Sequence, residues 1–197
     1  DYYASRGLGD VYKRQVQLVL TSSFNIATAV NRGQVVSIPY ALTGAGNKTL
    51  RCYVDGVDTE DRTITASTAN GSLSVATSGM AHGTHGVQIV VELELPDGTT
   101  IKSNSIYFGI GVRETGNSTP VFSTRFDYAD GAVIGAGDTP YIQTRQFDSY
   151  KVTYAAYNPL ETPTKVDVTV GGRLAASSMV AFGTQILNLS LIHISEP

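Results

Sequence analysis

Four acidic residues close together in the chain are the first candidates for binding chemistry. They are Asp55, Asp58, Glu60 and Asp61. Carboxylate oxygens are the ligands that calcium prefers, but the spacing here does not match the Asp-x-Asp-x-Asp-Gly calcium loop. We therefore interpret the segment as a solvated loop between strands. We keep the four residues as a candidate ligand-contact loop, and we predict no metal site and no cofactor.

Two histidines three residues apart are the second candidate. His82 and His85 lie in the Gly-rich stretch from Met80 to Gly86, where a flexible turn could present both rings to a metal ion. Two ligands do not complete a site, and neither a Cys nor an acidic residue lies nearby in the sequence. The pattern therefore favours a glycine-shaped turn with exposed imidazoles.

Catalytic motifs give no support for an enzyme. The chain contains no Gly-x-Ser-x-Gly elbow and no phosphate-binding loop. The Gly-x-Gly at Gly109 and Gly111 lacks the third glycine and the helix of a dinucleotide site. Hydrolysis by paired carboxylates requires a cleft, which small sandwiches rarely provide. We therefore expect a protein without catalytic activity.

Composition excludes several classes of partner. The formal net charge of −3 and the absence of a basic stripe argue against nucleic acid. No apolar run approaches the length of a membrane span, and no leader begins the sequence, although the parent chain could carry one. Cys52 is the only cysteine, so no disulfide forms within the chain.

The elements that must hold these residues are predicted to be β-strands. Val, Ile, Thr and Tyr alternate with polar residues, and short clusters of Gly, Asn, Asp and Ser separate the runs. Pro39 indicates an edge position or a bulge, and Asp97-Gly98 favours a tight hairpin between runs at 87–95 and 100–110. The residues expected to face inward are Val36, Ile38, Tyr40, Leu42, Leu50, Cys52, Val54, Leu73 and Val75.

An internal repeat at an offset of 114 residues predicts two tandem units. It aligns Tyr40 with Tyr154 and Cys52 with Val166, so 150–156 and 165–170 are expected to repeat two strands of the first unit. The second unit stops near Leu189, before a counterpart of the run at 100–110. We expect it to be less stable, or to have its missing strand replaced by the tail.

Both ends are similar to translated sequencing-adapter read-through. The segments concerned are Asp1 to Gln15 and Ser190 to Pro197. We therefore predict non-native segments at 1–15 and 190–197, a first module at 16–113, a linker at 114–120 and an incomplete second module at 121–189.

Several stretches of the first unit and of the linker resemble immunoglobulin-like modules of large gut-bacteriophage proteins. They are Ser37 to Tyr40, Gly44 to Leu50, Tyr53 to Gly56, Thr84 to Gly86, Ser103 to Tyr107 and Asn117 to Pro120. The resemblance implies an all-β fold of two tandem immunoglobulin-like β-sandwich modules, the second truncated, in a virion or tail-associated protein. The chain lacks the Cys pair and the buried Trp of antibody-type domains.

Two functions follow as expectations. The first is a non-catalytic structural or adhesive module of a phage virion or tail, acting as a spacer or surface-binding unit. Its partners would be other virion subunits or a bacterial cell-surface glycan or protein, with no nucleic acid and no membrane, and self-association is left open. It would reside in the virion or on the extracellular surface. The alternative is a carbohydrate-binding or accessory module of a secreted bacterial enzyme, with contacts from Asp55 to Asp61 or from Asp127 to Asp138.

Overall fold

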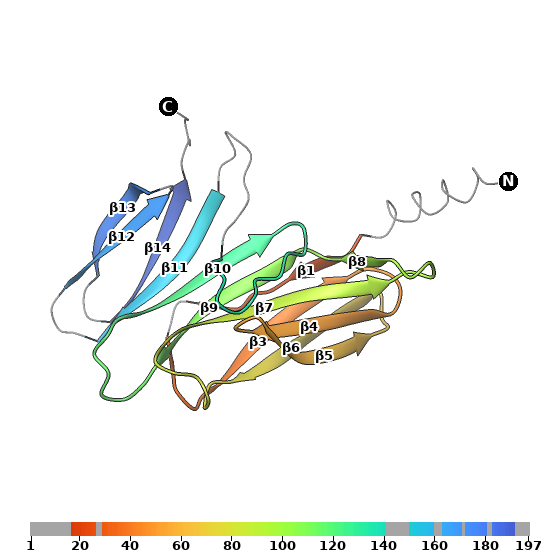
Figure 1. Ribbon diagram of the computed structural model, residues 1–197, viewed down its shortest axis with the longest axis horizontal. Coiled ribbons are helices and arrows are strands. Elements are labelled where there is room, and N and C mark those ends of the chain that lie inside the picture. Colours follow the sequence, from red (N-terminus) through yellow and green to blue (C-terminus); the bar gives the residue numbers. More distant parts are fainter. Residues whose placement is uncertain are drawn as a thin grey trace.

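The computed structural model describes residues 17–26, 29–140, 150–159, 163–170, 172–180 and 183–191. In this part of the chain every regular element is a β-strand (Figure 1). The first nine strands form one unit. They are β1 (Val19–Thr21), β2 (Val30–Asn31), β3 (Val35–Thr43), β4 (Lys48–Val54), β5 (Val57–Ile64), β6 (Thr68–Ala76), β7 (Gly83–Glu94), β8 (Thr100–Lys102) and β9 (Ser105–Arg113).

Two sheets make up the first module. One has the strand order β1-β3-β6, and the other has the order β5-β4-β7-β9, with β8 beside the end of β7. All these neighbours are antiparallel, whereas the short β2 pairs in parallel with β9. This arrangement, with the first, third and sixth strands facing the others, is that of an immunoglobulin-like sandwich whose fifth strand lies on the larger sheet.

The core lies between the two sheets and follows the predicted alternation. Ile38 and Leu73 from the smaller sheet and Leu50 from the larger one are fully buried in a single apolar cluster. Cys52 is also buried, as predicted, whereas Val54 is only half-buried at the end of its strand. The period-2 pattern therefore identified the inner faces of both sheets.

Pro39 occupies a local edge of the smaller sheet. The ladder between β1 and β3 covers residues 41–43 of β3 only, so beyond it β3 has β6 as its one partner. A residue without an N–H is tolerated there.

The predicted strand at 100–110 is interrupted. Ser103 and Asn104 separate β8 from β9 because their polar groups bind elsewhere. The Ser103 hydroxyl accepts from the amide of Val91 at 3.0 Å, and the Asn104 side chain contacts both the amide and the carbonyl of Leu20, at 2.9 and 2.8 Å. The Asn104 side chain thus extends the hydrogen bonding to β1 in the opposite sheet.

The second module contains five strands. They are β10 (Val121–Tyr128), β11 (Tyr150–Asn158), β12 (Thr164–Val170), β13 (Arg173–Val180) and β14 (Gly183–Leu191). The pairs β10–β11, β11–β14 and β12–β13 reproduce the pairs β1–β3, β3–β6 and β4–β5 of the first module. The described residues hold no counterpart of β7 or β9. The predicted all-β, immunoglobulin-like sandwich fold class is confirmed by this strand pairing, whereas truncation of the second module stays a prediction.

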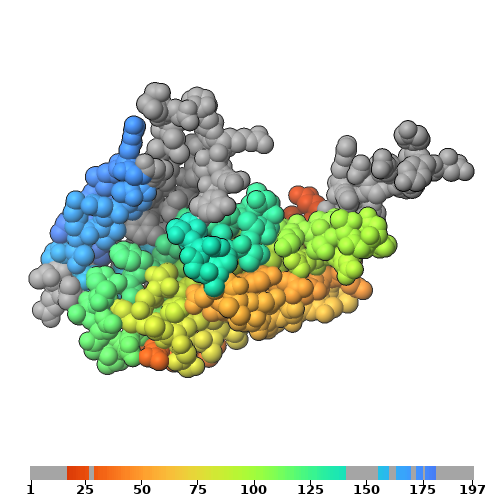
Figure 2. Space-filling view, in the orientation of Figure 1, coloured from red at the N-terminus to blue at the C-terminus, as the bar shows by residue number. Residues whose placement is uncertain are grey.

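The larger sheet continues from one module into the other. β10 pairs antiparallel with β9 as well as with β11, so residues 114–120, predicted as a linker, join two hydrogen-bonded strands. In Figure 2 the blue residues, which include those of β12 and β13, lie at the end of the molecule away from the orange residues of β4 and β5. The division into domains at 114–120 stays a prediction.

The predicted foreign ends lie almost wholly outside the described residues, so their origin stays a prediction. Only Ser190 and Leu191 are described. They extend β14, where they pair with Lys151 and Tyr150 of β11. In the described part of the chain the tail therefore lengthens an existing strand and does not replace a missing one.

Candidate functional site

The acidic residues of β5 form ion pairs with arginines. The Arg51 Nη1 atom of β4 lies 3.0 Å from a carboxylate oxygen of Asp58 and 2.8 Å from one of Asp61. Glu60 pairs with Arg62 at 2.7 Å on the same strand. The segment is therefore an ion-paired strand and not the solvated loop that the sequence favoured.

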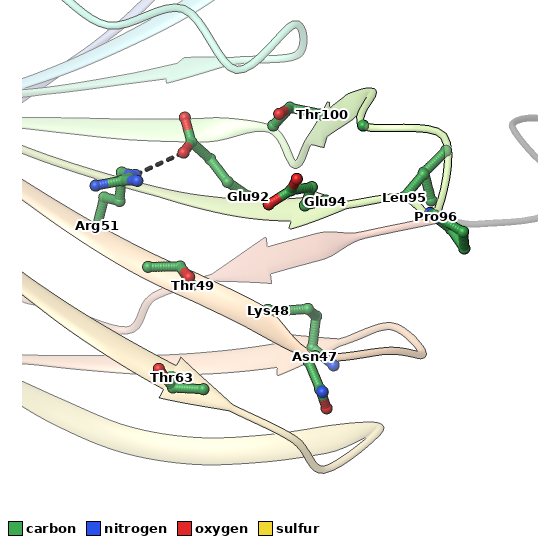
Figure 3. A pocket seen from close by; sticks show the side chains of 11 residues that line it. Asn47, Lys48, Thr49, Arg51, Thr63, Glu92, Glu94, Leu95, Pro96 and Thr100 are labelled. Atoms are coloured by element: carbon green, nitrogen blue, oxygen red, sulfur yellow. Dashed lines mark hydrogen bonds and ion pairs between the residues drawn. The ribbon is translucent and has the colours of Figure 1, made fainter.

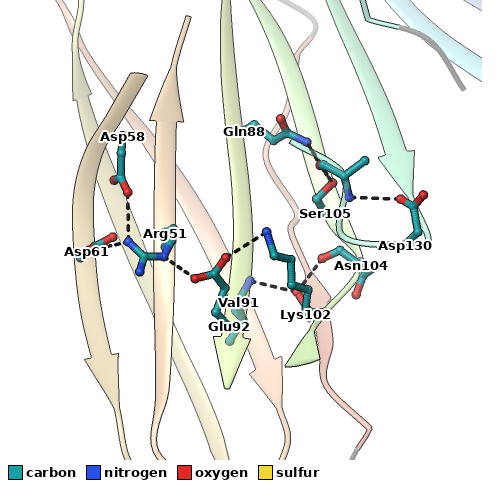
Figure 4. A network of polar contacts seen from close by, with 12 residues as sticks. Arg51, Asp58, Asp61, Gln88, Val91, Glu92, Lys102, Asn104, Ser105 and Asp130 are labelled. Atoms are coloured by element: carbon teal, nitrogen blue, oxygen red, sulfur yellow. Dashed lines mark hydrogen bonds and ion pairs between the residues drawn. The ribbon is translucent and has the colours of Figure 1, made fainter. Parts of the chain in front are cut away.

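Arg51 also links Asp58 and Asp61 to the neighbouring strands on its other side (Figure 4). Its Nε atom lies 2.5 Å from Glu92 of β7, whose other oxygen lies 3.1 Å from the Nζ atom of Lys102 on β8. Burial raises the pKa of Glu92, but hydrogen bonds from Arg51 and Lys102 outweigh it, so this pKa lies below its ordinary value. We call Asp58, Asp61, Arg51, Glu92 and Lys102 the charge ladder; it crosses four strands of one sheet.

Asp55 is separated from the other three predicted residues. It occupies the β4–β5 turn with a φ of 48°, followed by Gly56 at 77°, which is the backbone of a tight hairpin. Its carboxylate lies 2.7 Å from Nδ1 of His85 and accepts a 2.8 Å hydrogen bond from the amide of Gly86. The candidate loop is thus divided between this turn and the charge ladder.

The two histidines are half-buried and have separate structural partners, which corrects the prediction of exposed rings in a turn. His85 lies on β7, and its Nε2 atom is 3.0 Å from the carbonyl of Ala81. The Nδ1 atom of His82 accepts from the amide of Glu114 at 3.1 Å, so Nε2 carries the proton and donates to the carbonyl of Thr119 at 2.9 Å. His82 therefore braces the connection between the modules.

The described residues contain no group of three or more His, Cys, Asp or Glu side chains that could hold a metal ion. They also contain no helix that is long and apolar enough to cross a membrane.

A polar groove, which the sequence did not indicate, lies beside the charge ladder on the outer face of the larger sheet (Figure 3). It has a volume of about 660 Å³ and receives the Arg51–Glu92 pair at one end. Amide and hydroxyl groups line much of the rest, from Asn47, Thr49, Thr63 and Thr100. Such side chains can both donate to and accept from a ligand rich in hydroxyl groups.

Lys48 is a buried cation at the margin of this groove. Its side chain is buried. The ammonium donates to the carbonyls of Gly44 and Gly46, both at 2.7 Å, and to that of Ala66 at 3.0 Å. Burial lowers the pKa of this ammonium. The ammonium thus links the β3–β4 loop to the β5–β6 loop. Gly44 and Gly46, just before Lys48, are the local sequence feature that indicates a backbone able to surround the ammonium.

Cys52 is an inert core thiol. Burial, opposed by a hydrogen bond with Thr59, raises its pKa to about 11. Because the thiolate is the reactive form, this environment suppresses nucleophilic chemistry.

The strand order is that of immunoglobulin-like β-sandwich modules. Cys52 is free, so the stability of the fold depends on burial of the apolar core and not on a disulfide. No protein-family model matches this chain, and no curated protein matches it. Among solved structures it is similar to fibronectin(III)-like modules of Clostridium thermocellum CbhA, with 16% sequence identity and a TM-score of 0.35 over 86% of this chain and 78% of that chain. The assignment of the fold rests on the strand pairing of the chain itself.

Proposed function

We propose that this chain is a non-catalytic structural or adhesive module pair of a phage virion or tail-associated protein. It acts as a spacer or surface-binding unit, placed in the virion or on the extracellular surface. Its partners are other virion subunits or a glycan or protein of a bacterial cell surface.

The observation that carries this proposal is the sheet that continues from β9 to β10 and β11. Further contacts brace the same boundary. The guanidinium of Arg113 lies 4.1 Å from the ring centre of Tyr157, and His82 binds both ends of the connection between β9 and β10. A spacer needs a fixed angle between modules, and hydrogen-bonded strands resist bending more than a free linker does.

Immunogold labelling tests the proposal. Antibodies against residues 17–191 are applied to purified gut virus particles and to the soluble secreted fraction from the same sample. The proposal expects label on particles or tails. Label confined to the secreted fraction would contradict it.

The alternative is a carbohydrate-binding or accessory module of a secreted bacterial enzyme, and the polar groove favours it. A glycan array with the purified chain provides the test. Reproducible binding that Asn47→Ala or Thr100→Ala abolishes would favour this function. Thr21→Ala, on the exposed end of β1 in the opposite sheet, is the matched control. A chain that binds no glycan leaves the spacer function in place.

A further inference from the structure

Part of the connection between β10 and β11 lies on the first module. This connection spans residues 129–149, whereas the matching connection between β1 and β3 spans residues 22–34 only. The longer connection reaches back across the outer face of the larger sheet, where residues 130–138 contact β7, β9 and the β4–β5 turn. We call residues 130–138 the strap.

Two polar side chains of the first module hold the middle of the strap by its backbone (Figure 4). Gln88 of β7 donates from Nε2 to the carbonyl of Ala132, and its Oε1 atom accepts from the amide of Ile134 at 2.7 Å. The hydroxyl of Ser105 on β9 donates to the same carbonyl at 2.5 Å and accepts from Nε2 of Gln88 at 2.9 Å. Gln88 and Ser105 are both buried, so water does not compete for these hydrogen bonds.

Close backbone packing fixes the strap before and after these hydrogen bonds. Gly131 has a φ of 70°, and a β-carbon there would lie 2.6 Å from the carbonyl oxygen of Ser103. A β-carbon on Gly56, in the β4–β5 turn, would lie 2.1 Å from the amide nitrogen of Ala136. Neither glycine has room for a side chain, so the backbone of the strap rests directly on that of the first module at both places.

The strap lies to one side of the ladder that joins the modules. That ladder pairs residues 124–128 of β10 with β9, whereas Gln88 lies one strand further into the first module and Gly56 follows the strand after that. Two paired strands can twist relative to each other, and a contact away from the ladder opposes this rotation.

We propose that the strap is a clasp that fixes the angle between the two modules, with the Gln88 amide as the group that locks it. The clasp deepens the proposed spacer function and rests on it for its purpose. Without the clasp the second module would turn about the β9–β10 ladder.

Two matched glycine substitutions test the clasp. Gly56→Ala places a methyl group against the strap, whereas Gly98→Ala lies in another Asp-Gly turn with the same φ of 77° and open space around it. Backbone strain is common to both variants, so only the first displaces the strap. In hydrogen exchange of the full chain, Gly56→Ala is expected to speed exchange of the Ile134 amide about tenfold relative to Gly98→Ala. Equal rates in the two variants would overturn the clasp.

The angle between the modules is measured by the distance between two spin labels. Thr43→Cys on β3 and Lys165→Cys on β12 place the labels at exposed positions, and the buried Cys52 stays unlabelled. We expect one narrow distance distribution that broadens in Gly56→Ala and in Gln88→Leu but not in the control variant. A distribution that stays narrow while the strap exchanges faster would mean that the ladder alone sets the angle, and would overturn the proposal.

Unchanged hydrogen exchange in β3 and β6 verifies that each variant is folded. If Gly56→Ala does not fold, Gly131→Ala replaces it, because the added methyl group then displaces the strap from its other end. The purified chain suffices for all these measurements. A failed clasp therefore leaves the location of the chain on virus particles to immunogold labelling, and the two proposals can fail separately.

Discussion

Replacing Lys48 with methionine removes a buried cation while keeping most of its stem. The wild-type ammonium donates to three carbonyls, those of Gly44, Gly46 and Ala66. These bonds close the loops at one end of the first sandwich. The substitution therefore asks whether a charge without a carboxylate partner stabilises the fold.

Two opposing effects determine the size of the change. Hydrogen bonds from charged donors each contribute about 1.5–3 kcal/mol, whereas desolvation of the ammonium costs several kcal/mol. Methionine removes both the hydrogen bonds and the cost of burying the ammonium, and it leaves the three carbonyls without their donor. Gly46 and Ala66 are exposed residues, so water can rehydrate part of the site. We expect a net loss of about 2–4 kcal/mol in the free energy of unfolding.

Urea unfolding of the full chain, followed by circular dichroism, measures this loss. Lys165→Met is the matched control, because this exposed lysine has a single carboxylate partner and its loss should cost about 0.5 kcal/mol or less. A Lys48→Met variant within about 1 kcal/mol of the wild type would refute the reasoning, since it would mean that desolvation cancels the three hydrogen bonds.

Three further outcomes are expected. Because the pKa of Glu92 is lower in the folded chain than in the unfolded chain, its ionised carboxylate stabilises the fold at neutral pH, and this stability is lost as the pH falls through the folded pKa. Below about pH 4 the wild type should therefore lose more stability than Glu92→Gln in urea titrations. Parallel pH curves for the two proteins would contradict this. The Cys52 thiol should stay unmodified by a thiol reagent at pH 8 until urea unfolds the chain, and rapid native labelling would contradict its burial. Asp55→Ala should cost about 1–3 kcal/mol through loss of its contacts with His85 and Gly86, whereas Asp127→Ala, at an exposed pair with Arg125, should cost less than about 1 kcal/mol.

Sequence alone predicted the strands and the core because burial in a sheet has a period of two residues. The alternation identified Ile38, Leu50 and Leu73 as inward-facing, and all three are fully buried. The repeat also predicted strands at 150–156 and 165–170, where β11 and β12 lie. Local pattern carries this information, since neighbouring side chains on a strand point to opposite faces.

The candidate site was predicted less well because its contacts depend on register between distant strands. Arg51 meets Glu92 only when β4 and β7 lie side by side, and nothing within residues 55–61 indicates that pairing. The acidic cluster therefore suggested a solvated loop, although its carboxylates form ion pairs on a strand. Lys48 was missed for a different reason, since its partners are backbone carbonyls, which any sequence provides.

The position of β5 gives its charged residues a role in solubility. The strand ends the larger sheet, so one side of its backbone has no partner among the described residues. Asp58, Glu60, Asp61 and Arg62 crowd that edge with ionised groups, which a second sheet would have to desolvate before it could pair there. Three of the four residues that suggested a ligand-contact loop thus protect the first module against aggregation.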